Sequence, residues 1–406
     1  MNLKINKKIL LLGLIIILLG GIFSPIAAEQ LDEDLLLEKQ IGLNNNLDFD
    51  KKINILMNLG NMPSLSASVV KNDSVVWSKT YGYSDIRHRK KASGDTLYLV
   101  GSVSKTITAT ATMQLYERGY FDLDDDVSEY LPFDLKNPKY PNINITFRML
   151  LSHQSSIGRD DILRTLFLFF LGYPCEWLDN FLMSDGKFYN FRNWLDKPPG
   201  EKFAYANTNF VILGYLIEKI SNQSFEEYCK ENIFEPLNMT NTGYRLSDFD
   251  MDKIAVPHVR IGRIYFLLPI YENRAHSAAG LRTTAVDLSH FLIAHMNGGL
   301  YEGIRILNES TVKLMQTIQY PNGKYGLGWR NVTYENGETY IGHGGNIHGA
   351  RAEIKLRLSD NIGVIYIWNE NFAIWETVES RTPRLMTMPL EKFSIFLIEK
   401  LLFEKA

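Results

Sequence analysis

Residues 99–115 read LVGSVSKTITATATMQL, in which a short apolar start is followed by a long helical pattern. Residues 97–101 have the apolar pattern of an extended segment. A helix is predicted to follow from Ser102 to Arg118. Apolar residues recur there at helical spacing, and Gly119 follows as a C-cap glycine does. Alanine and threonine fill the other faces, so we expect a helix that is buried on most sides.

Ser102 and Lys105 lie three residues apart, so a helix places both side chains on one face. A hydroxyl is a poor nucleophile until a neighbour takes its proton, and Ser102 also opens a helix whose amides stabilise negative charge. These residues alone leave two interpretations open, a nucleophile or a capping serine with a structural lysine. Ser-x-x-Lys occurs three more times, on a predicted strand, in a turn and at an exposed helix start: Ser68/Lys71, Ser184/Lys187 and Ser310/Lys313.

Strand patterns occupy both ends of the chain, and helical patterns occupy the middle. Residues 351–358 alternate strictly between charged and apolar side chains, which predicts a half-buried antiparallel strand. Hairpins are predicted over 64–83 and, around the Asn336-Gly337 turn, over 330–342, with a further strand at 362–368 and a last helix at 390–403. The expected fold class is α/β (α+β), a single antiparallel sheet from both chain ends flanked by helices.

A mostly helical subdomain, about residues 121–293, is expected to be inserted between those two ends. It contains ILRTLFLFFLG at 162–172, which is too short to span a bilayer. We interpret residues 160–193 as a lid over the site, and its apolar run suits acyl or lipid-like substrates.

Composition excludes several classes of protein. The 406 residues are 45% hydrophobic and carry a net charge of −3 without a long basic run, so nucleic acid is not an expected partner. Cys175 and Cys229 allow at most one disulfide. His290 and His295 do not share a helix face, so neither a metal nor another cofactor is implied.

The first 28 residues are typical of an export signal. Three lysines precede an apolar run at 9–23, and SPIAA leads to Ala28. Because Ile26 weakens the cleavage signal, a cleaved signal peptide and an uncleaved membrane anchor both stay open. The protein is therefore expected outside the cytoplasm, secreted or membrane-anchored. A polar linker (29–50) would join this segment to a catalytic domain at 51–403.

Several blocks together resemble the serine β-lactamase and penicillin-binding protein superfamily, in its class C-like branch of esterases and D-amino-acid peptidases. Residues 99–115 are followed by GYFDLDDDVSEY at 119–130 and ITFRMLLSHQSS at 145–156. Further matching blocks follow in family order at 199–214, 233–242, 278–299 and 325–345. The resemblance implies a β-lactamase/transpeptidase-like fold.

The resemblance also implies the site. It assigns catalysis to Ser102, Lys105 and Tyr205, with the phenol of Tyr205 as general base. Substrate binding falls to Asn207 of the Tyr-x-Asn element and to residues of the third family element, which are His343, Gly344, Gly345 and Asn346. The backbone amides of Ser102 and Asn346 would form the oxyanion hole.

The third element departs from the usual Lys-Thr-Gly of the family. It reads His343-Gly344-Gly345, and a neutral imidazole recognises a carboxylate less strongly than a permanent cation does. The expected function is an exported serine hydrolase that acts through an acyl-enzyme on a small-molecule ester, lactone or D-amino-acid peptide. Two alternatives stay open: a DD-carboxypeptidase or β-lactamase acting on cell-wall or penicillin-like substrates, and a catalytically silent member that uses the fold for binding or assembly. The oligomeric state is left open.

Overall fold

The computed structural model describes residues 47–158, 178–261, 264–334, 337–372 and 390–406. They belong to two compact units. The larger unit comprises Ile53–Thr377 and Leu390–Ala406, and the features below lie in it. Of the smaller unit, residues 47–52 are described, and they include the start of helix α3 (Phe49–Leu59). The export segment, Cys175, the apolar run at 162–172 and Asn336 lie outside the described residues.

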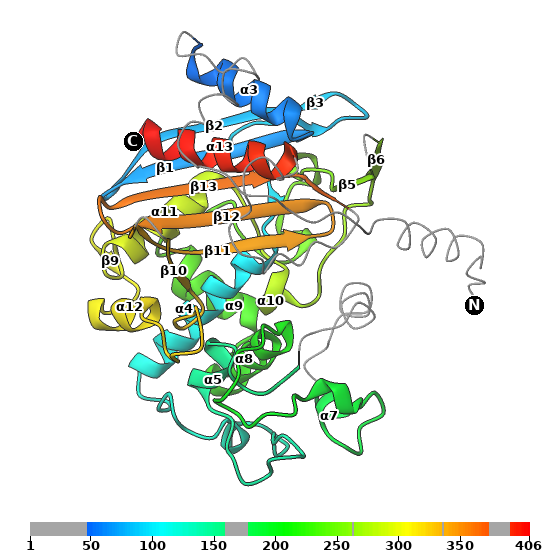
Figure 1. Cartoon of the computed structure of the whole chain (residues 1–406), viewed down its shortest axis with the longest axis vertical. Helices are drawn as coiled ribbons and strands as arrows, with labels where there is room; N and C mark the ends of the chain where they lie inside the picture. The colour runs from blue at the N-terminus through cyan, green and yellow to red at the C-terminus, as the bar shows by residue number, and fades with distance from the viewer. Residues whose placement is uncertain (1–46, 159–177, 262–263, 335–336, 373–389) are drawn as a thin grey trace, which may run out of the picture. The chain divides into compact units, whose positions relative to one another are not determined.

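A seven-stranded sheet joins the two ends of the chain (Figure 1). Its order is β10-β11-β12-β13-β1-β2-β3, and every neighbouring pair is antiparallel. The strands are β1 (Ser64–Lys71), β2 (Ser74–Asp85), β3 (Lys90–Lys91), β10 (Arg330–Thr333), β11 (Thr339–Ile347), β12 (Ala350–Arg357) and β13 (Ile362–Trp368). The pairing of β1 with β13, with Ser68 opposite Ile365, unites the first strands with the last. The predicted antiparallel sheet from both chain ends is confirmed.

Helices cover both faces of this sheet. Ser289 of α11 (Ala285–Met296) donates a 2.8 Å hydrogen bond to the Ser68 hydroxyl on one face. On the other face, Lys355 and Tyr366 donate to Glu399 of α13 (Leu390–Lys405), the helix that crosses the sheet in Figure 1. β12 alternates between buried and half-buried residues as its sequence pattern predicts.

Helix α4 (Ser104–Glu117) precedes the middle of the chain. The middle supplies α5 (Phe147–Leu151), α7 (Leu178–Leu182), α8 (Asn207–Ser221), α9 (Phe225–Cys229) and α10 (His276–Ala279). It also contains a hairpin, β5 (His258–Ile261) and β6 (Ile264–Leu267), which the sequence analysis did not predict. The signal was present, because both segments are rich in β-branched and aromatic residues. No helix in the described part of the chain combines the length and the apolar character needed to cross a membrane.

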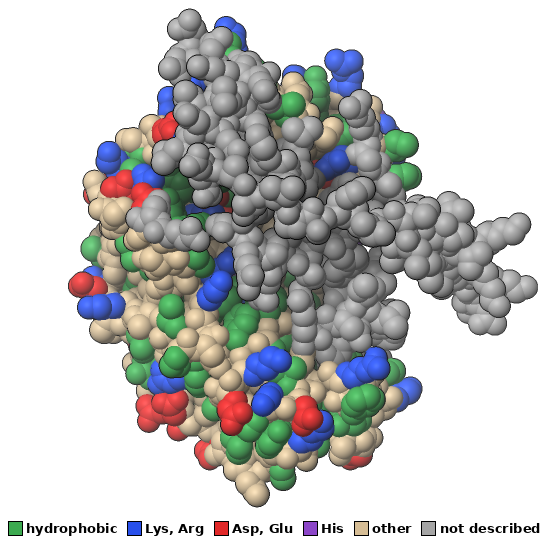
Figure 2. Space-filling view, in the orientation of Figure 1, with side chains coloured by type: hydrophobic (Ala, Val, Ile, Leu, Met, Phe, Trp, Pro, Cys, Tyr) green, Lys and Arg blue, Asp and Glu red, His purple; other side chains and the backbone are tan. Residues whose placement is uncertain are grey.

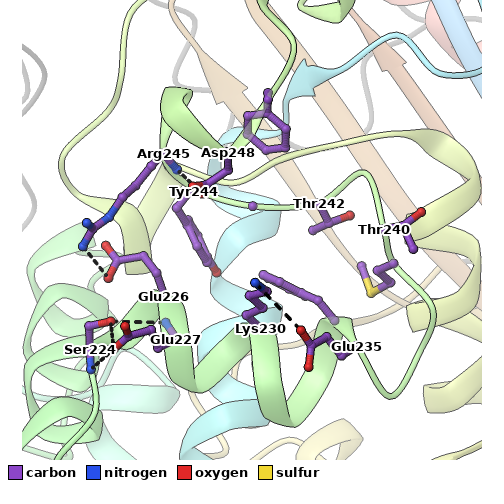
Figure 3. A pocket seen from close by; sticks show the side chains of 14 residues that line it. Ser224, Glu226, Glu227, Lys230, Glu235, Thr240, Thr242, Tyr244, Arg245 and Asp248 are labelled. Atoms are coloured by element: carbon purple, nitrogen blue, oxygen red, sulfur yellow. Dashed lines mark hydrogen bonds and ion pairs between the residues drawn. The ribbon is translucent and has the colours of Figure 1, made fainter.

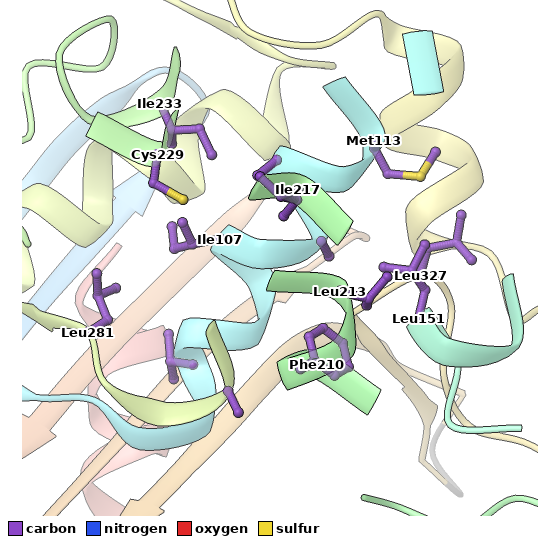
Figure 4. Packing of buried hydrophobic residues seen from close by; sticks show 14 of the residues in the cluster. Ile107, Met113, Leu151, Phe210, Leu213, Ile217, Cys229, Ile233, Leu281 and Leu327 are labelled. Atoms are coloured by element: carbon purple, nitrogen blue, oxygen red, sulfur yellow. The ribbon is translucent and has the colours of Figure 1, made fainter. Parts of the chain in front are cut away.

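Helix α4 is the centre of the core (Figure 4). Every residue from Ser104 to Leu115 is buried, and Ile107 and Met113 pack in the same cluster as Phe210 and Leu213 of α8. The buried threonines of α4 do not leave unpaired hydroxyls, because each bonds a carbonyl three or four residues earlier: Thr106 to Val103, Thr108 to Ser104, Thr110 to Thr106 and Thr112 to Thr108.

The helix ends where the sequence predicts. Gly119 has a φ of +74°, which a residue with a Cβ rarely adopts. Its amide donates to the carbonyl of Tyr116, and the amide of Tyr120 donates to that of Leu115. These are the two bonds of a Schellman motif, and they satisfy carbonyls that the helix end leaves free.

One buried histidine links α4 to α11. His295 is 2% exposed, and its Nε2 lies 3.0 Å from the Thr110 hydroxyl. Burial lowers the pKa of His295 from 6.5 to about 3. Because the unfolded chain binds this proton near pH 6.5 and the folded chain only near pH 3, protonation favours unfolding as the pH falls through that interval.

We therefore expect acid to destabilise the wild type more than His295→Gln, whose amide retains a partner for Thr110 but does not titrate. Between pH 7 and pH 4 the difference in unfolding free energy should be about 3 kcal/mol. Chemical denaturation of both proteins at the two pH values measures it. Parallel losses of stability in the two proteins would contradict this assignment.

Candidate active site

Ser102 lies in a 3₁₀ turn, Gly101–Val103, between the short strand β4 (Tyr98–Leu99) and α4. The sequence predicts it as the first residue of the helix, whereas α4 begins two residues later, at Ser104. The reason is Gly101, whose φ of +53° turns the chain sharply before the helix can start. Ser104 fixes this turn, because its hydroxyl donates to the Gly101 carbonyl at 2.6 Å and accepts from the Leu281 amide at 3.0 Å.

Lys105 is fully buried, with 0% exposure, and its Nζ is surrounded by oxygen atoms. It donates to Ser102 Oγ at 3.0 Å, to Asn207 Oδ1 at 2.7 Å and to the Ala278 carbonyl at 2.7 Å. These three acceptors match the three N–H groups of an ammonium. Among the described residues, none of the other three Ser-x-x-Lys pairs joins its own serine to its own lysine by a hydrogen bond. As predicted, they lie in a strand, in a turn and in a helix.

Tyr205 and Asn207 reach Lys105 from the start of α8. The Lys105 ammonium lies 5.2 Å from the centre of the Tyr205 ring, and Asn207 is the first residue of the helix. The Tyr-x-Asn element therefore meets the Ser-x-x-Lys element, although about 100 residues separate them. Asn207 therefore contacts the lysine directly.

His153 holds the start of α8 in place, although no pattern in the sequence predicts this role. Its Nδ1 accepts from the Ala206 amide at 3.3 Å and lies 3.2 Å from the Asn209 side-chain nitrogen. The imidazole stands 4.3 Å from the Tyr205 ring, centre to centre. Burial lowers the pKa of His153 well below 6.5, helped by the charge of Lys105, so the ring stays neutral.

The backbone of His153 has a φ of +60°, an uncommon value for a residue with a side chain. In the sequence, His153 belongs to a block at 145–156 that resembles the family, and the resemblance gives it no role. Neither its spacing nor its neighbours indicate a contact with residue 206. A positive φ and a long-range acceptor leave no periodic signal in a sequence.

β11 brings the third element to the turn Gly101–Val103, named here the nucleophile turn after the candidate nucleophile Ser102. A Cβ on Gly345 would lie 1.8 Å from the Val100 carbonyl oxygen and 3.2 Å from the Ser102 amide nitrogen. A Cβ on Gly101 would lie 3.1 Å from the Asn346 amide nitrogen. The two backbones are therefore in direct contact, and the amides of Ser102 and Asn346 come from adjoining segments. Gly344 points to the opposite face, where a Cβ would meet the Glu353 carboxylate at 2.5 Å.

His343 lies on the same face of β11 as Gly345, because residues two apart on a strand share a face. It is 3% exposed, and its ring is 6.3 Å from that of Tyr205 and 5.7 Å from that of Tyr325. Burial lowers its pKa to about 3, and the positive charge of Lys105 acts in the same direction. The imidazole is therefore uncharged at neutral pH.

Aromatic rings form the wall between α8 and β11. Phe203 and Tyr325 stack at 5.5 Å, and Tyr325 also lies 6.2 Å from Tyr205 and 5.3 Å from His153. These rings pack around the two neutral imidazoles.

α10 supplies the third acceptor for Lys105, and a hydrogen bond to Glu226 fixes its first residue, His276. His276 Nδ1 bonds Glu226, which also lies 3.5 Å from Arg245. Burial opposes ionisation of Glu226, yet the hydrogen bond with His276 lowers its pKa to about 2. The carbonyl of Ala278, two residues into the helix, is thereby held at the lysine.

Glu226 and Arg245 also line a cavity of about 560 Å³ (Figure 3). Phe234, Met239, Tyr244 and Phe249 contribute apolar side chains to it. None of the predicted site residues lines this cavity. Within the described ranges, no three His, Cys, Asp or Glu side chains are grouped to hold a metal ion, and Cys229 is a buried free thiol.

The family model described as "Beta-lactamase" matches residues 49–382. The chain belongs to the beta-lactamase family. The chain is 28% identical over 325 residues to Protein flp of Staphylococcus aureus (strain N315), and the match covers 79% of this chain and 62% of that protein. The chain thus spans about three fifths of the length of that relative.

Two further relatives carry names that describe an activity. A putative D-alanyl-D-alanine carboxypeptidase of Escherichia coli (strain K12) is 26% identical over 305 residues, covering 66% of this chain and 68% of that protein. The solved structure of a D-stereospecific amidohydrolase from Streptomyces sp. is 26% identical with a TM-score of 0.60, covering 80% of this chain and 95% of that one. The predicted family and fold class are confirmed.

We expect Gly345→Ala to slow hydrolysis roughly 100-fold, because the new Cβ would push β11 and the nucleophile turn apart. Gly94→Ala is the matched control, since nothing lies within 4 Å of its Cβ position. The rate of p-nitrophenyl ester hydrolysis by each variant measures the effect. Equal rates in the two variants would show that the close approach of β11 does not matter.

His153→Asn and His153→Gly separate the hydrogen bonds of this residue from its backbone conformation. Both residues tolerate a positive φ, but only Asn places an acceptor where Nδ1 lies. We expect the Gly variant to lose about 1–3 kcal/mol more stability and to be the slower hydrolase, because the Ala206 amide is left unpaired. Thermal denaturation and ester hydrolysis test this, and an Asn variant no better than the Gly variant would exclude the positioning role.

Proposed function

We propose that this member of the beta-lactamase family is a serine hydrolase that works through an acyl-enzyme, with Ser102 as the nucleophile. The observation that carries the proposal is the 3.0 Å contact between Lys105 Nζ and Ser102 Oγ, at a lysine with no exposure to solvent. Burying an ammonium group costs free energy unless hydrogen-bond acceptors surround it. Here it stands beside a half-buried hydroxyl in a sharp turn, as activation of a nucleophile requires.

The proton acceptor is assigned to Tyr205. With its three N–H groups donated to Ser102, Asn207 and Ala278, the Lys105 ammonium has no lone pair to accept a proton. A phenol beside such a cation loses its proton more easily, so the phenolate of Tyr205 takes the proton of Ser102. Ser102 Oγ then bonds the substrate carbonyl carbon, and Tyr205 returns the proton to the leaving oxygen or nitrogen as its bond to that carbon breaks.

Water completes the cycle by the same route in reverse. It gives a proton to Tyr205 and attacks the acyl carbon, and the ester bond to Ser102 breaks with return of the proton to Oγ. Negative charge on the carbonyl oxygen in both steps would be held by the amides of Ser102 and Asn346. The contact of Gly345 and Gly101 across these two segments supports that assignment.

The substrate class is proposed as a small ester, lactone or D-amino-acid peptide or amide. The neutral His343 supports this choice over β-lactams and other carboxylate-bearing substrates, because it offers no cation to a carboxylate. The name of the Streptomyces relative is in accord with an amide substrate. The Escherichia coli relative instead favours a DD-carboxypeptidase as the second candidate.

We also propose that residues 1–28 direct export, as a signal peptide or as a membrane anchor. The lysines ahead of the apolar run, and the small residues that end it, support this. Secretion of a fusion of residues 1–50 to a reporter enzyme, and its loss when the apolar run is interrupted by charges, tests the proposal.

We expect Ser102→Ala to lose about 10⁴-fold or more in p-nitrophenyl ester hydrolysis, and to lose labelling by a fluorophosphonate probe. Ser310→Ala is the matched control, because it removes the serine of another Ser-x-x-Lys pair, on the exposed start of α12 (Glu309–Gln316). Peptide mapping of the labelled protein identifies the modified serine. Folded wild-type protein that neither hydrolyses nor becomes labelled would instead support the catalytically silent alternative.

A further inference from the structure

The cavity shown in Figure 3 is large enough for a small organic molecule. Its volume of about 560 Å³ falls within the range of about 300–1,000 Å³ that small-molecule sites occupy. All of its lining residues lie between Ser224 and Phe249, in α9 and in the segments that follow it. Because none of the candidate active-site residues lines this cavity, a molecule bound here would not occupy the space around Ser102.

The floor of the cavity is apolar and aromatic. Phe234, Met239 and Tyr244 are buried, and the rings of Phe234 and Tyr244 lie 5.9 Å apart. Phe249 lines the cavity as a half-buried side chain. A surface of this kind binds an apolar body, and it suits an aromatic body in particular.

A carboxylate stands beside the Phe249 ring. Gly243 has no side chain, and a Cβ at this position would lie 3.1 Å from Phe249 Cζ and 3.3 Å from Asp248 Oδ2. The aromatic ring and the carboxylate oxygen therefore approach the same point of the backbone. A single small ligand can contact both groups at once.

Negative charge is in excess around the cavity. Its charged lining residues are four carboxylates and two basic side chains: Glu226, Glu227, Glu235, Asp248, Lys230 and Arg245. Arg245 lies 3.5 Å from Glu226, and Lys230 lies 3.9 Å from Glu235. Both basic groups therefore already have a carboxylate partner within the cavity wall.

The other two carboxylates, those of Glu227 and Asp248, form no ion pair with any residue that the structure describes. Glu227 accepts a hydrogen bond from the Ser224 hydroxyl, and Asp248 accepts one from the Arg245 amide. An anionic ligand would be repelled by this excess of negative charge. An ammonium group is attracted both by the carboxylates and by the faces of the aromatic rings.

We propose that this cavity is a binding site for a small amphiphilic amine. The apolar body of the amine packs on Phe234, Tyr244 and Phe249, and its ammonium group lies at Asp248. The site is separate from Ser102, and the proposal does not depend on the proposed hydrolysis.

Three probes with the same phenyl ring and different end groups test the proposal: 2-phenylethylammonium, 2-phenylethanol and 3-phenylpropionate. Isothermal titration calorimetry at neutral pH and low salt measures their affinities for the full-length protein. We expect the ammonium to bind about tenfold more tightly than the alcohol and the carboxylate to bind most weakly. The same preference should persist after Ser102 has been modified by a fluorophosphonate.

Two variants locate the binding. Asp248→Asn keeps an acceptor for the Arg245 amide but removes the charge, so the preference for ammonium over alcohol should fall about threefold or more. Phe249→Ala removes the aromatic contact and should weaken binding of the ammonium and the alcohol alike. Asp252→Asn and Phe191→Ala are the matched controls, because both residues are exposed and neither lines the cavity.

The proposal is overturned if the wild type does not bind the ammonium, or binds it no better than the alcohol or the carboxylate. It is also overturned if Asp248→Asn and Phe249→Ala bind the probes as the wild type does, or if modification of Ser102 abolishes binding. Failure of the fluorophosphonate to label Ser102 would count against the proposed function alone, because the titrations of unmodified protein still test this site.

Discussion

The buried ammonium of Lys105 is the interaction on which the rest of the site depends. A charge removed from water is tolerated only where each of its N–H groups has an acceptor, and here the acceptors come from three segments. Ser102 precedes the lysine in the nucleophile turn, Asn207 opens α8, and Ala278 contributes a carbonyl from α10. The fold must bring these segments together before the lysine can be buried, so the site is also part of the core.

A second constraint is the contact between β11 and the nucleophile turn. Gly345 and Gly101 leave no room for side chains between the two backbones. The sheet places β11 next to β12 in a fixed register, with Gly345 opposite Ala352, so the position of the third element follows from the pairing of the sheet. The turn is held from its other side by Ser104, which bonds both Gly101 and Leu281. Strand pairing and the helical core therefore meet at Ser102.

Much of this arrangement could be predicted from the sequence, because it depends on periodic patterns and short motifs. The alternation in β12 and the helical spacing after Ser102 led to the sheet and to α4. The family blocks led to Tyr205, Asn207 and His343, and the structure brings their rings or side chains around Lys105. The exact start of α4 was missed, since it depends on a positive φ at one glycine.

The parts of the site that could not be predicted come from groups that no motif or periodic pattern in the sequence marks. The Ala278 carbonyl is a backbone atom that any residue would provide, and only the position of α10 makes it an acceptor. His153 acts through an unusual backbone conformation and a contact with residue 206, which no local pattern indicates. The hydrogen bond between Glu226 and His276 joins residues 50 positions apart. Tertiary packing decides all three.

A crystal structure of the protein after reaction with a fluorophosphonate tests the role of Ser102 directly. We expect phosphorus bonded to Ser102 Oγ, with the phosphoryl oxygen within about 3 Å of the amide nitrogens of both Ser102 and Asn346. Lys105 should keep its hydrogen bonds to Asn207 and Ala278. A phosphoryl oxygen directed to solvent, or an adduct on any other residue, would contradict this role.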